Sequence, residues 1–248
     1  MGFAPYAHQI GRDPLIAAAR DQGMAAMAIT RTHHFAALWP EAEMLAAAGM
    51  VSMVFVSSVP FMAPAGGASP LFGTNPVAFG WPRPSGAPMV WDLATSVMAR
   101  GEIQIALRDG EQVHEGAGIG PDGEPTTDPA AILAGAQLPF GGYKGSAIAL
   151  MVELMAGPLF GEVTSAEAGA ADNGDGGPST GGELILAFDP ARLGASGAAA
   201  HGETVFEAIV SQPGARLPGD RRIGNRARTA AEGITIPRSL YDTVWSLR

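Results

Sequence analysis

The chain has 248 residues, of which 47% are hydrophobic and 16% are charged, so it can bury a substantial core. Its net charge is −9 and its basic residues are scattered, which argues against nucleic acid or an anionic membrane surface as a partner and favours a small molecule. The absence of cysteine excludes disulfides, thiolate catalysis and cysteine-ligated metals. No apolar run reaches 18 residues and the start lacks the layout of a signal peptide, so we expect a cytoplasmic protein that does not bind membranes.

The first third of the chain alternates helical and strand patterns. A helix is expected over residues 13–22, with Asp13 as its cap and Pro14 in its first turn, and a buried strand over residues 24–30. A second helix over residues 40–48 and a strand over residues 50–56 follow. With 34 glycines and 20 prolines, this alternation predicts a loop-rich α/β fold.

The remaining patterns are less regular. Residues 59–76 predict a folded loop that leads into a strand, and the strand over residues 89–91 should continue into a helix with Asp92 at the corner. Residues 162–182 contain few hydrophobic side chains, which predicts a mobile surface excursion. The other expected elements are a helix over 144–156, a strand over 183–188, a helix around 200–210, a turn at 219–222 and an amphipathic tail over 237–247.

Three glycines, Gly118, Gly120 and Gly123, satisfy the G-x-G-x-x-G spacing of a Rossmann dinucleotide site. A true site follows a buried strand and opens a helix, because the helix amino terminus receives the pyrophosphate. Here both flanks have the composition of turns. A Rossmann site is therefore not expected, and a nicotinamide cofactor would bind in another way.

His33 and His34 are adjacent and follow a predicted strand, which makes an acid/base role as reasonable as a structural one. A metal pair is not expected, since neighbouring residues in an extended segment point to opposite faces and no third ligand is evident. Asp92 either caps a helix or faces a ligand. Lys144 is the single lysine beside fourteen arginines, and its glycine-rich surroundings suit a phosphate or ribose oxygen, although an incidental position at a helix start is the alternative.

Five motifs occur in an order that resembles the malate/L-lactate dehydrogenase-like oxidoreductases. They are Thr32-His-His-Phe-Ala-Ala-Leu-Trp-Pro, Pro70-Leu-Phe-Gly-Thr-Asn-Pro-Val-Ala-Phe-Gly, Asp92-Leu-Ala-Thr-Ser, Pro125-Thr-Thr-Asp-Pro and Pro139-Phe-Gly-Gly-Tyr-Lys-Gly. The doubled histidine and the late Leu217-Pro-Gly-Asp-Arg-Arg are most similar to the branch of Δ1-piperideine-2-carboxylate/Δ1-pyrroline-2-carboxylate reductases. The resemblance covers essentially the whole chain.

This resemblance implies a non-Rossmann NAD(P)-binding mixed sheet flanked by helices, and a homodimer. It also implies reduction of a cyclic imino acid by NADPH or NADH, giving L-proline or L-pipecolate. Within the motifs, His34 matches the acid/base histidine, and Asp92 matches a residue of the active-site and cofactor corner. The remaining positions match cofactor contacts of the family: Ser58, Leu93, Ala94, Thr95, Lys144, Gly219 and Asp220.

The front of the chain departs from the family pattern. Family members carry an amino-terminal helical segment with a Ser-His-Gly motif and a nearby arginine suited to the substrate carboxylate, and neither is present in this chain. His8 lies in Tyr6-Ala-His-Gln and does not match the motif, so it receives no role and the carboxylate-binding residue stays unassigned. We expect an NAD(P)-binding domain over residues 1–212. Residues 213–248 would form a turn and a helix that pack on the family's amino-terminal helical domain.

Two other functions remain open on this sequence. A 2-hydroxy acid dehydrogenase of the malate or lactate type, whose reverse substrate is a 2-keto acid, would use the same cofactor residues. A non-catalytic homologue that only binds nucleotide is the second alternative, because the Ser-His-Gly motif is missing. The histidine doublet and Ala36-Ala-Leu-Trp-Pro favour the cyclic imino acid reductase.

Overall fold

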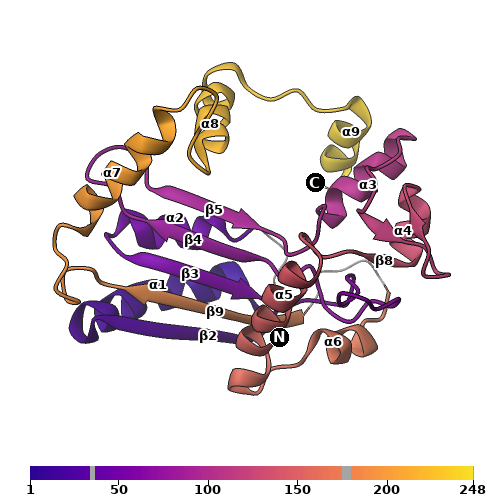
Figure 1. Cartoon of the computed structure of the whole chain (residues 1–248), viewed down its shortest axis with the longest axis horizontal. Helices are drawn as coiled ribbons and strands as arrows, with labels where there is room; N and C mark the ends of the chain where they lie inside the picture. The colour runs from indigo at the N-terminus through magenta and orange to yellow at the C-terminus, as the bar shows by residue number, and fades with distance from the viewer. Residues whose placement is uncertain (34–36, 175–179, 248) are drawn as a thin grey trace. The chain divides into compact units, whose positions relative to one another are not determined.

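The computed structural model describes residues 1–33, 37–174 and 180–247. The chain divides into two compact units, Met1–Glu203 and Thr204–Arg248, with the boundary inside helix α7 (Ala198–Val210). The boundary expected from the sequence was residue 212. The first unit contains all the strands of the described chain (Figure 1).

A six-stranded sheet organises the first unit, in the order β1-β2-β9-β3-β4-β5. Only β1 and β2 run parallel, and all other neighbouring pairs are antiparallel. The sheet is therefore mixed, as the family resemblance implied. Its strands are β1 (Gly2–Phe3), β2 (Met24–His33), β9 (Thr180–Phe188), β3 (Val51–Val56), β4 (Val77–Trp81) and β5 (Met89–Leu93).

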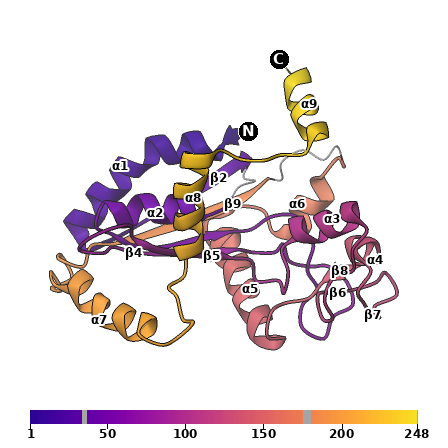
Figure 2. The same cartoon turned by 90° about the horizontal axis from the view of Figure 1, so that it is seen from above.

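Helices cover both faces of this sheet (Figure 2). On one face α1 (Ala4–Gln22) and α2 (Trp39–Ala47) bury Leu15, Leu45 and inward-facing strand residues such as Val54 and Ile185. On the other face α5 (Tyr143–Ala156) packs Val152 and Ala156 on strand residues that include Phe55 and Leu184. Because side chains alternate along a strand, each strand supplies both cores.

Helix α1 begins nine residues earlier than the sequence predicted. Asp13 and Pro14 lie inside it, and Phe3 is its cap residue. The hydrophobic periodicity missed its first part because residues 5–13 bury little apolar surface. This part of the helix is instead held on the sheet by the polar side chain of His8, which is described below. The strand that follows, β2, continues to His33 with a bulge between Ile29 and Thr32, where Arg31 has φ +52°.

The corner at Asp92 also differs from the prediction. Asp92 and Leu93 belong to strand β5, and helix α3 (Arg100–Asp109) begins only at Arg100. Residues 94–99 are held in irregular backbone by hydrogen bonds to other loops, including Thr95 N to the Thr74 carbonyl and Val97 N to the Leu138 carbonyl. These long-range bonds, which local sequence does not reveal, displace the helix start.

The predicted excursion over residues 162–182 is largely ordered in its described part. Thr164 and Glu167 form a reciprocal capping box that starts helix α6 (Ser165–Ala171), and β9 already begins at Thr180. Residues 175–179 lie outside the described residues. The prediction failed because a short helix of Ser, Ala, Glu and Gly has no apolar stripe. Its start is nevertheless marked in the sequence by the capping residues Thr164 and Glu167.

A smaller sheet in the order β7-β6-β8 contains the rejected glycine motif. Its strands are β6 (Gly118–Ile119), β7 (Pro125–Thr126) and β8 (Ala136–Gln137), and α4 (Pro129–Ala134) packs on β6 and β8. Gly120 and Gly123 form the turn between β6 and β7, and no helix follows that turn directly. The expectation that this motif is no Rossmann site is confirmed.

The second unit contains the end of α7, α8 (Asp220–Glu232) and α9 (Arg238–Ser246). The turn predicted at 219–222 is the start of α8, since Gly219 in the left-handed region caps the helix and Asp220 opens it. Helix α9 confirms the predicted amphipathic tail. Among all described residues no single helix is long and apolar enough to cross a membrane. The bent pair Tyr143–Phe160 and Ser165–Ala171 is long and apolar enough only when its two segments are taken together, and both segments contact the sheet.

Candidate active site

The structure brings three of the predicted cofactor segments together through backbone contacts. Thr74 accepts hydrogen bonds at its carbonyl from both the backbone N–H and the hydroxyl of Thr95, each 2.8 Å long. The Thr95 carbonyl in turn accepts from Phe140 N at 3.0 Å, which ties Thr95 to the loop before Lys144. Ser58 lies beside Gly73, where an added β-carbon would approach the Ser58 backbone nitrogen to 3.1 Å.

Lys144 occupies the first turn of α5 behind two glycines in the left-handed region, Gly141 (φ +57°) and Gly142 (φ +61°). A β-carbon at Gly142 would meet nothing within 4 Å, so this turn is open on its outer side. A β-carbon at Gly145 would overlap the Phe140 carbonyl, so this helix start requires glycine. Lys144 is exposed, and no side chain caps the helix. The backbone N–H groups of Lys144 and Gly145 already donate to the Gly141 carbonyl (3.4 Å) and the Phe140 carbonyl (3.0 Å), so the exposed ammonium is the group that a ligand anion can reach at this turn.

Asp92 faces a different element. Its carboxylate Oδ2 accepts a hydrogen bond of 3.1 Å from Leu38 N, at the amino terminus of α2. Asp92 thus serves as a cap, as one interpretation of the sequence held, but for α2 and not for the helix that follows it. It lies on the same side of β5 as Val90, which packs on α1 and α2, whereas α5 covers the opposite face. Leu93 is exposed and Ala94 is half-buried at the same strand end.

Gly219 and Asp220 lie in the second unit, where the Asp220 carboxylate accepts from Leu217 N at 2.9 Å. The turn borders a cavity of about 630 Å³. Four arginines contribute to its lining: Arg216, Arg221, Arg222 and Arg226. Guanidinium groups bind phosphate through paired hydrogen bonds, so the cavity suits an anionic group.

His34, the predicted acid/base histidine, lies outside the described residues. Its neighbour His33 ends β2 half-buried, in register with Phe3 on one side and Thr180 on the other. The roles of His34, Asp92 and the cofactor residues remain predictions from the resemblance.

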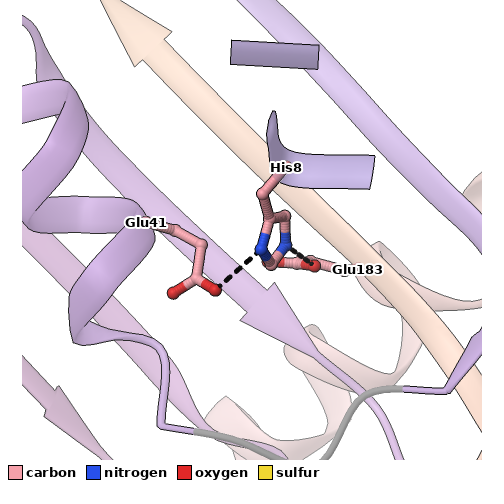
Figure 3. A group of neighbouring side chains, drawn as sticks. All are labelled: His8, Glu41 and Glu183. Atoms are coloured by element: carbon pink, nitrogen blue, oxygen red, sulfur yellow. Dashed lines mark hydrogen bonds and ion pairs between the residues drawn. The ribbon is translucent and has the colours of Figure 1, made fainter. Parts of the chain in front are cut away.

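No motif in the sequence pairs His8 with two buried glutamates, yet the structure brings them together (Figure 3). The His8 ring lies between Glu41 of α2 and Glu183 of β9, with Nδ1 3.0 Å from Glu41 Oε1 and Nε2 2.6 Å from Glu183 Oε2. The exposed fractions of the side chains are 12% for His8, 5% for Glu41 and 1% for Glu183. Burial lowers the pKa of His8, but hydrogen bonds and the negative charges of Glu183 and Glu41 outweigh it and raise this pKa to about 9.

A second buried carboxylate, Glu153 of α5, is held by neutral donors. Its oxygens accept from Asn75 Nδ2 at 2.8 Å, from Ser165 Oγ at 2.7 Å and from Ser165 N. Asn75 also donates to the Ala149 carbonyl at 3.0 Å and has φ +35°. This network ties α5, α6 and the loop that carries Thr74 into one unit. The only sequence feature that pointed to this network was Asn75 within the Thr-Asn-Pro motif.

Comparison with known proteins agrees with this fold. The family described as malate/L-lactate dehydrogenase matches residues 1–244. A Δ1-pyrroline-2-carboxylate reductase of Ancylobacter novellus is 51% identical over 99% of this chain and 73% of its own length. A Δ1-pyrroline-2-carboxylate/Δ1-piperideine-2-carboxylate reductase of Pseudomonas aeruginosa is 52% identical over 99% of this chain and 74% of its own length.

Solved structures give the same answer. The crystal structure of Δ1-piperideine-2-carboxylate reductase from Pseudomonas syringae pv. tomato superposes with a TM-score of 0.94 at 43% identity, over 100% of this chain and 75% of that one. The resemblance seen in the ordered motifs, and the mixed sheet flanked by helices that it implied, are both confirmed. The chain belongs to the malate/L-lactate dehydrogenase family and is an oxidoreductase of the kind that uses a nicotinamide cofactor.

Proposed function

We propose that the chain reduces cyclic imino acids with a reduced nicotinamide cofactor, converting Δ1-pyrroline-2-carboxylate to L-proline and Δ1-piperideine-2-carboxylate to L-pipecolate. The observation that carries this proposal is the 51–52% identity to reductases of those names along 99% of the chain. The arrangement of Ser58, Thr95 and the loop before Lys144 around Gly73 and Thr74 supports a shared cofactor site.

The residues present fit a dinucleotide. The open glycine turn at Gly141 and Gly142 and the exposed Lys144 would hold its phosphate or ribose oxygens, with Ser58 near the nicotinamide. When bound, the reduced nicotinamide supplies the hydride that the imine carbon accepts. His34 would keep the imine nitrogen protonated, because an iminium is the better electrophile. The bond from Leu38 N to Asp92 supports a role for Asp92 beside the segment that carries His34, since Leu38 follows His34 by four residues.

NADPH is the cofactor we propose over NADH. The arginine-lined cavity beside Gly219 supports this choice, because NADPH carries an additional phosphate that guanidinium groups recognise. The Arg221→Gln variant should weaken NADPH binding about tenfold and leave NADH binding within twofold, as measured by titration of each cofactor. Equal losses for both cofactors would refute the assignment of this cavity to the additional phosphate.

The reaction is tested by following NADPH oxidation with both cyclic imines and, side by side, with 2-keto acids. Faster turnover of the imines supports the proposal, while faster turnover of the keto acids would identify a 2-hydroxy acid dehydrogenase. Cofactor binding without turnover of any of these substrates would identify a nucleotide-binding homologue.

We further propose a cytoplasmic homodimer. Exposed apolar side chains on α9, among them Leu240, Val244 and Trp245, and on α5, among them Leu150 and Leu154, support self-association. Light scattering at micromolar concentration should give the mass of two chains, and a monomer would contradict this proposal.

A further inference from the structure

We propose that His8 is a positioning residue: it joins β9 to the first turn of α2 and thereby fixes the Leu38 N–H that binds the Asp92 carboxylate. The inference rests on the proposed function in one respect, because it takes Asp92 as the active-site carboxylate. Its structural part, the dependence of the Leu38 contact on His8, stands without that assignment.

The geometry indicates an imidazolium between two carboxylates and not a metal centre. The two ring nitrogens of His8 face different glutamates from opposite sides of the ring (Figure 3). Both nitrogens donate only when the ring is protonated. A metal ion would bind one nitrogen and would need both carboxylates on that side. The ring instead supplies the positive charge that the buried glutamates require.

Glu183 provides a fixed anchor for this link. It lies in the interior of the six-stranded sheet, opposite Ile29 of β2 and Val56 of β3, so its backbone is paired on both sides. Its side chain points to the face that α1 and α2 cover, as do Ile185 and Ala187 two and four residues further along the strand. His8 therefore attaches α1 to a strand that is paired on both sides.

Glu41 connects this anchor to the start of α2. It is the third residue of the helix, and the helical hydrogen bond from Ala42 N to the Leu38 carbonyl (3.4 Å) runs beside it. Leu38 N then donates to Asp92 at 3.1 Å. Without the imidazolium, Glu41 and Glu183 would be like charges facing one another in the interior. Their repulsion would act on the first turn of α2 through Glu41, and on the Leu38 contact with it.

Hydrogen exchange at the Leu38 amide tests the structural part in the full chain. In His8→Leu the exchange rate should rise at least tenfold, and adding Glu183→Gln should restore most of the protection by removing the like charge. The control is Ile132→Ala, which removes a buried side chain (1% exposed) of α4, outside this network, and should lower the melting temperature without changing exchange at Leu38. Unchanged Leu38 exchange in His8→Leu would overturn the proposal.

Two further readouts separate positioning from other roles. In His8→Leu, kcat for imine reduction should fall about tenfold while KM for NADPH stays within twofold of the unmodified chain. The control Ile132→Ala should retain its kcat below its melting temperature. A retained kcat in His8→Leu would overturn the link to Asp92. If the unmodified chain reduces no imine, the proposed function fails and Leu38 exchange still decides the structural part.

Metal ions test the imidazolium assignment. Adding Mn²⁺, Zn²⁺ or a chelator should leave the melting temperature unchanged. A melting temperature that rises with either ion, and no longer rises in His8→Leu, would overturn the assignment in favour of a metal site.

Discussion

Two buried carboxylate clusters lie on opposite faces of the six-stranded sheet and are stabilised by different chemistry. On the face covered by α1 and α2, Glu41 and Glu183 share one cation, His8. On the face covered by α5, Glu153 accepts hydrogen bonds from Asn75 and Ser165, which carry no charge. The first cluster contains a histidine whose pKa the two glutamates raise to about 9, whereas the donors of the second cluster are neutral, so the two faces should respond differently to mutation and to pH.

Removal of the cation should give the largest effect. His8→Leu leaves two buried carboxylates without their shared counter-charge, which we expect to lower the free energy of unfolding by about 4 kcal/mol at neutral pH. Denaturant unfolding measures this loss, with Gln9→Leu on the exposed side of α1 as the matched control. Replacing His8, Glu41 and Glu183 together with leucine should recover most of the stability. A loss below about 1 kcal/mol in His8→Leu would show that the buried charges are not interdependent.

The pH dependence of stability should distinguish the two faces next. The pKa of His8 is raised from 6.5 to about 9 in the folded chain, so its contribution to stability is complete below the unfolded value and is lost as pH rises through 9. A shift of this size corresponds to about 3 kcal/mol between these limits. The charged groups that raise the pKa of the ring are Glu183 from β9 and Glu41 from α2. Unfolding measured between pH 6 and 10 should show this decline, and His8→Leu should remove it; an identical decline in the variant would assign the effect to other groups.

A smaller loss is expected on the α5 face. Glu153→Gln keeps one acceptor oxygen but turns an amide nitrogen toward donors, so at least one buried hydrogen bond is lost, at a cost of about 2 kcal/mol. Glu111→Gln, at an exposed glutamate, should have no measurable effect. The loss should be nearly constant between pH 6 and 9, because the donors carry no titrating charge. A decline with pH that resembles that of the His8 cluster would remove the distinction between the faces.

The two clusters also show what the sequence could predict. Strands β2, β3 and β9 and helices α2 and α5 were predicted because their apolar side chains repeat within a few residues. The motif order predicted the cofactor segments. The His8–Glu183 pair spans 175 residues and the Asn75–Glu153 pair spans 78, and neither leaves a local pattern. The first part of α1 was missed for the same reason, since a charged contact with a distant strand, and not an apolar stripe, holds it in place.

The smallest effect should separate binding from folding on the α5 face. Lys144 is exposed at the start of α5, whose later residue Glu153 is buried. Lys144→Ala should weaken NADPH binding about fivefold, since it removes one charge-assisted hydrogen bond worth about 1 kcal/mol, and should leave the free energy of unfolding unchanged. Lys144→Arg, which retains the charge, should lose less affinity. If Lys144→Ala lowers stability as much as Glu153→Gln does, the lysine holds the helix start in place, and the cofactor phosphate or ribose must bind to other groups of this turn.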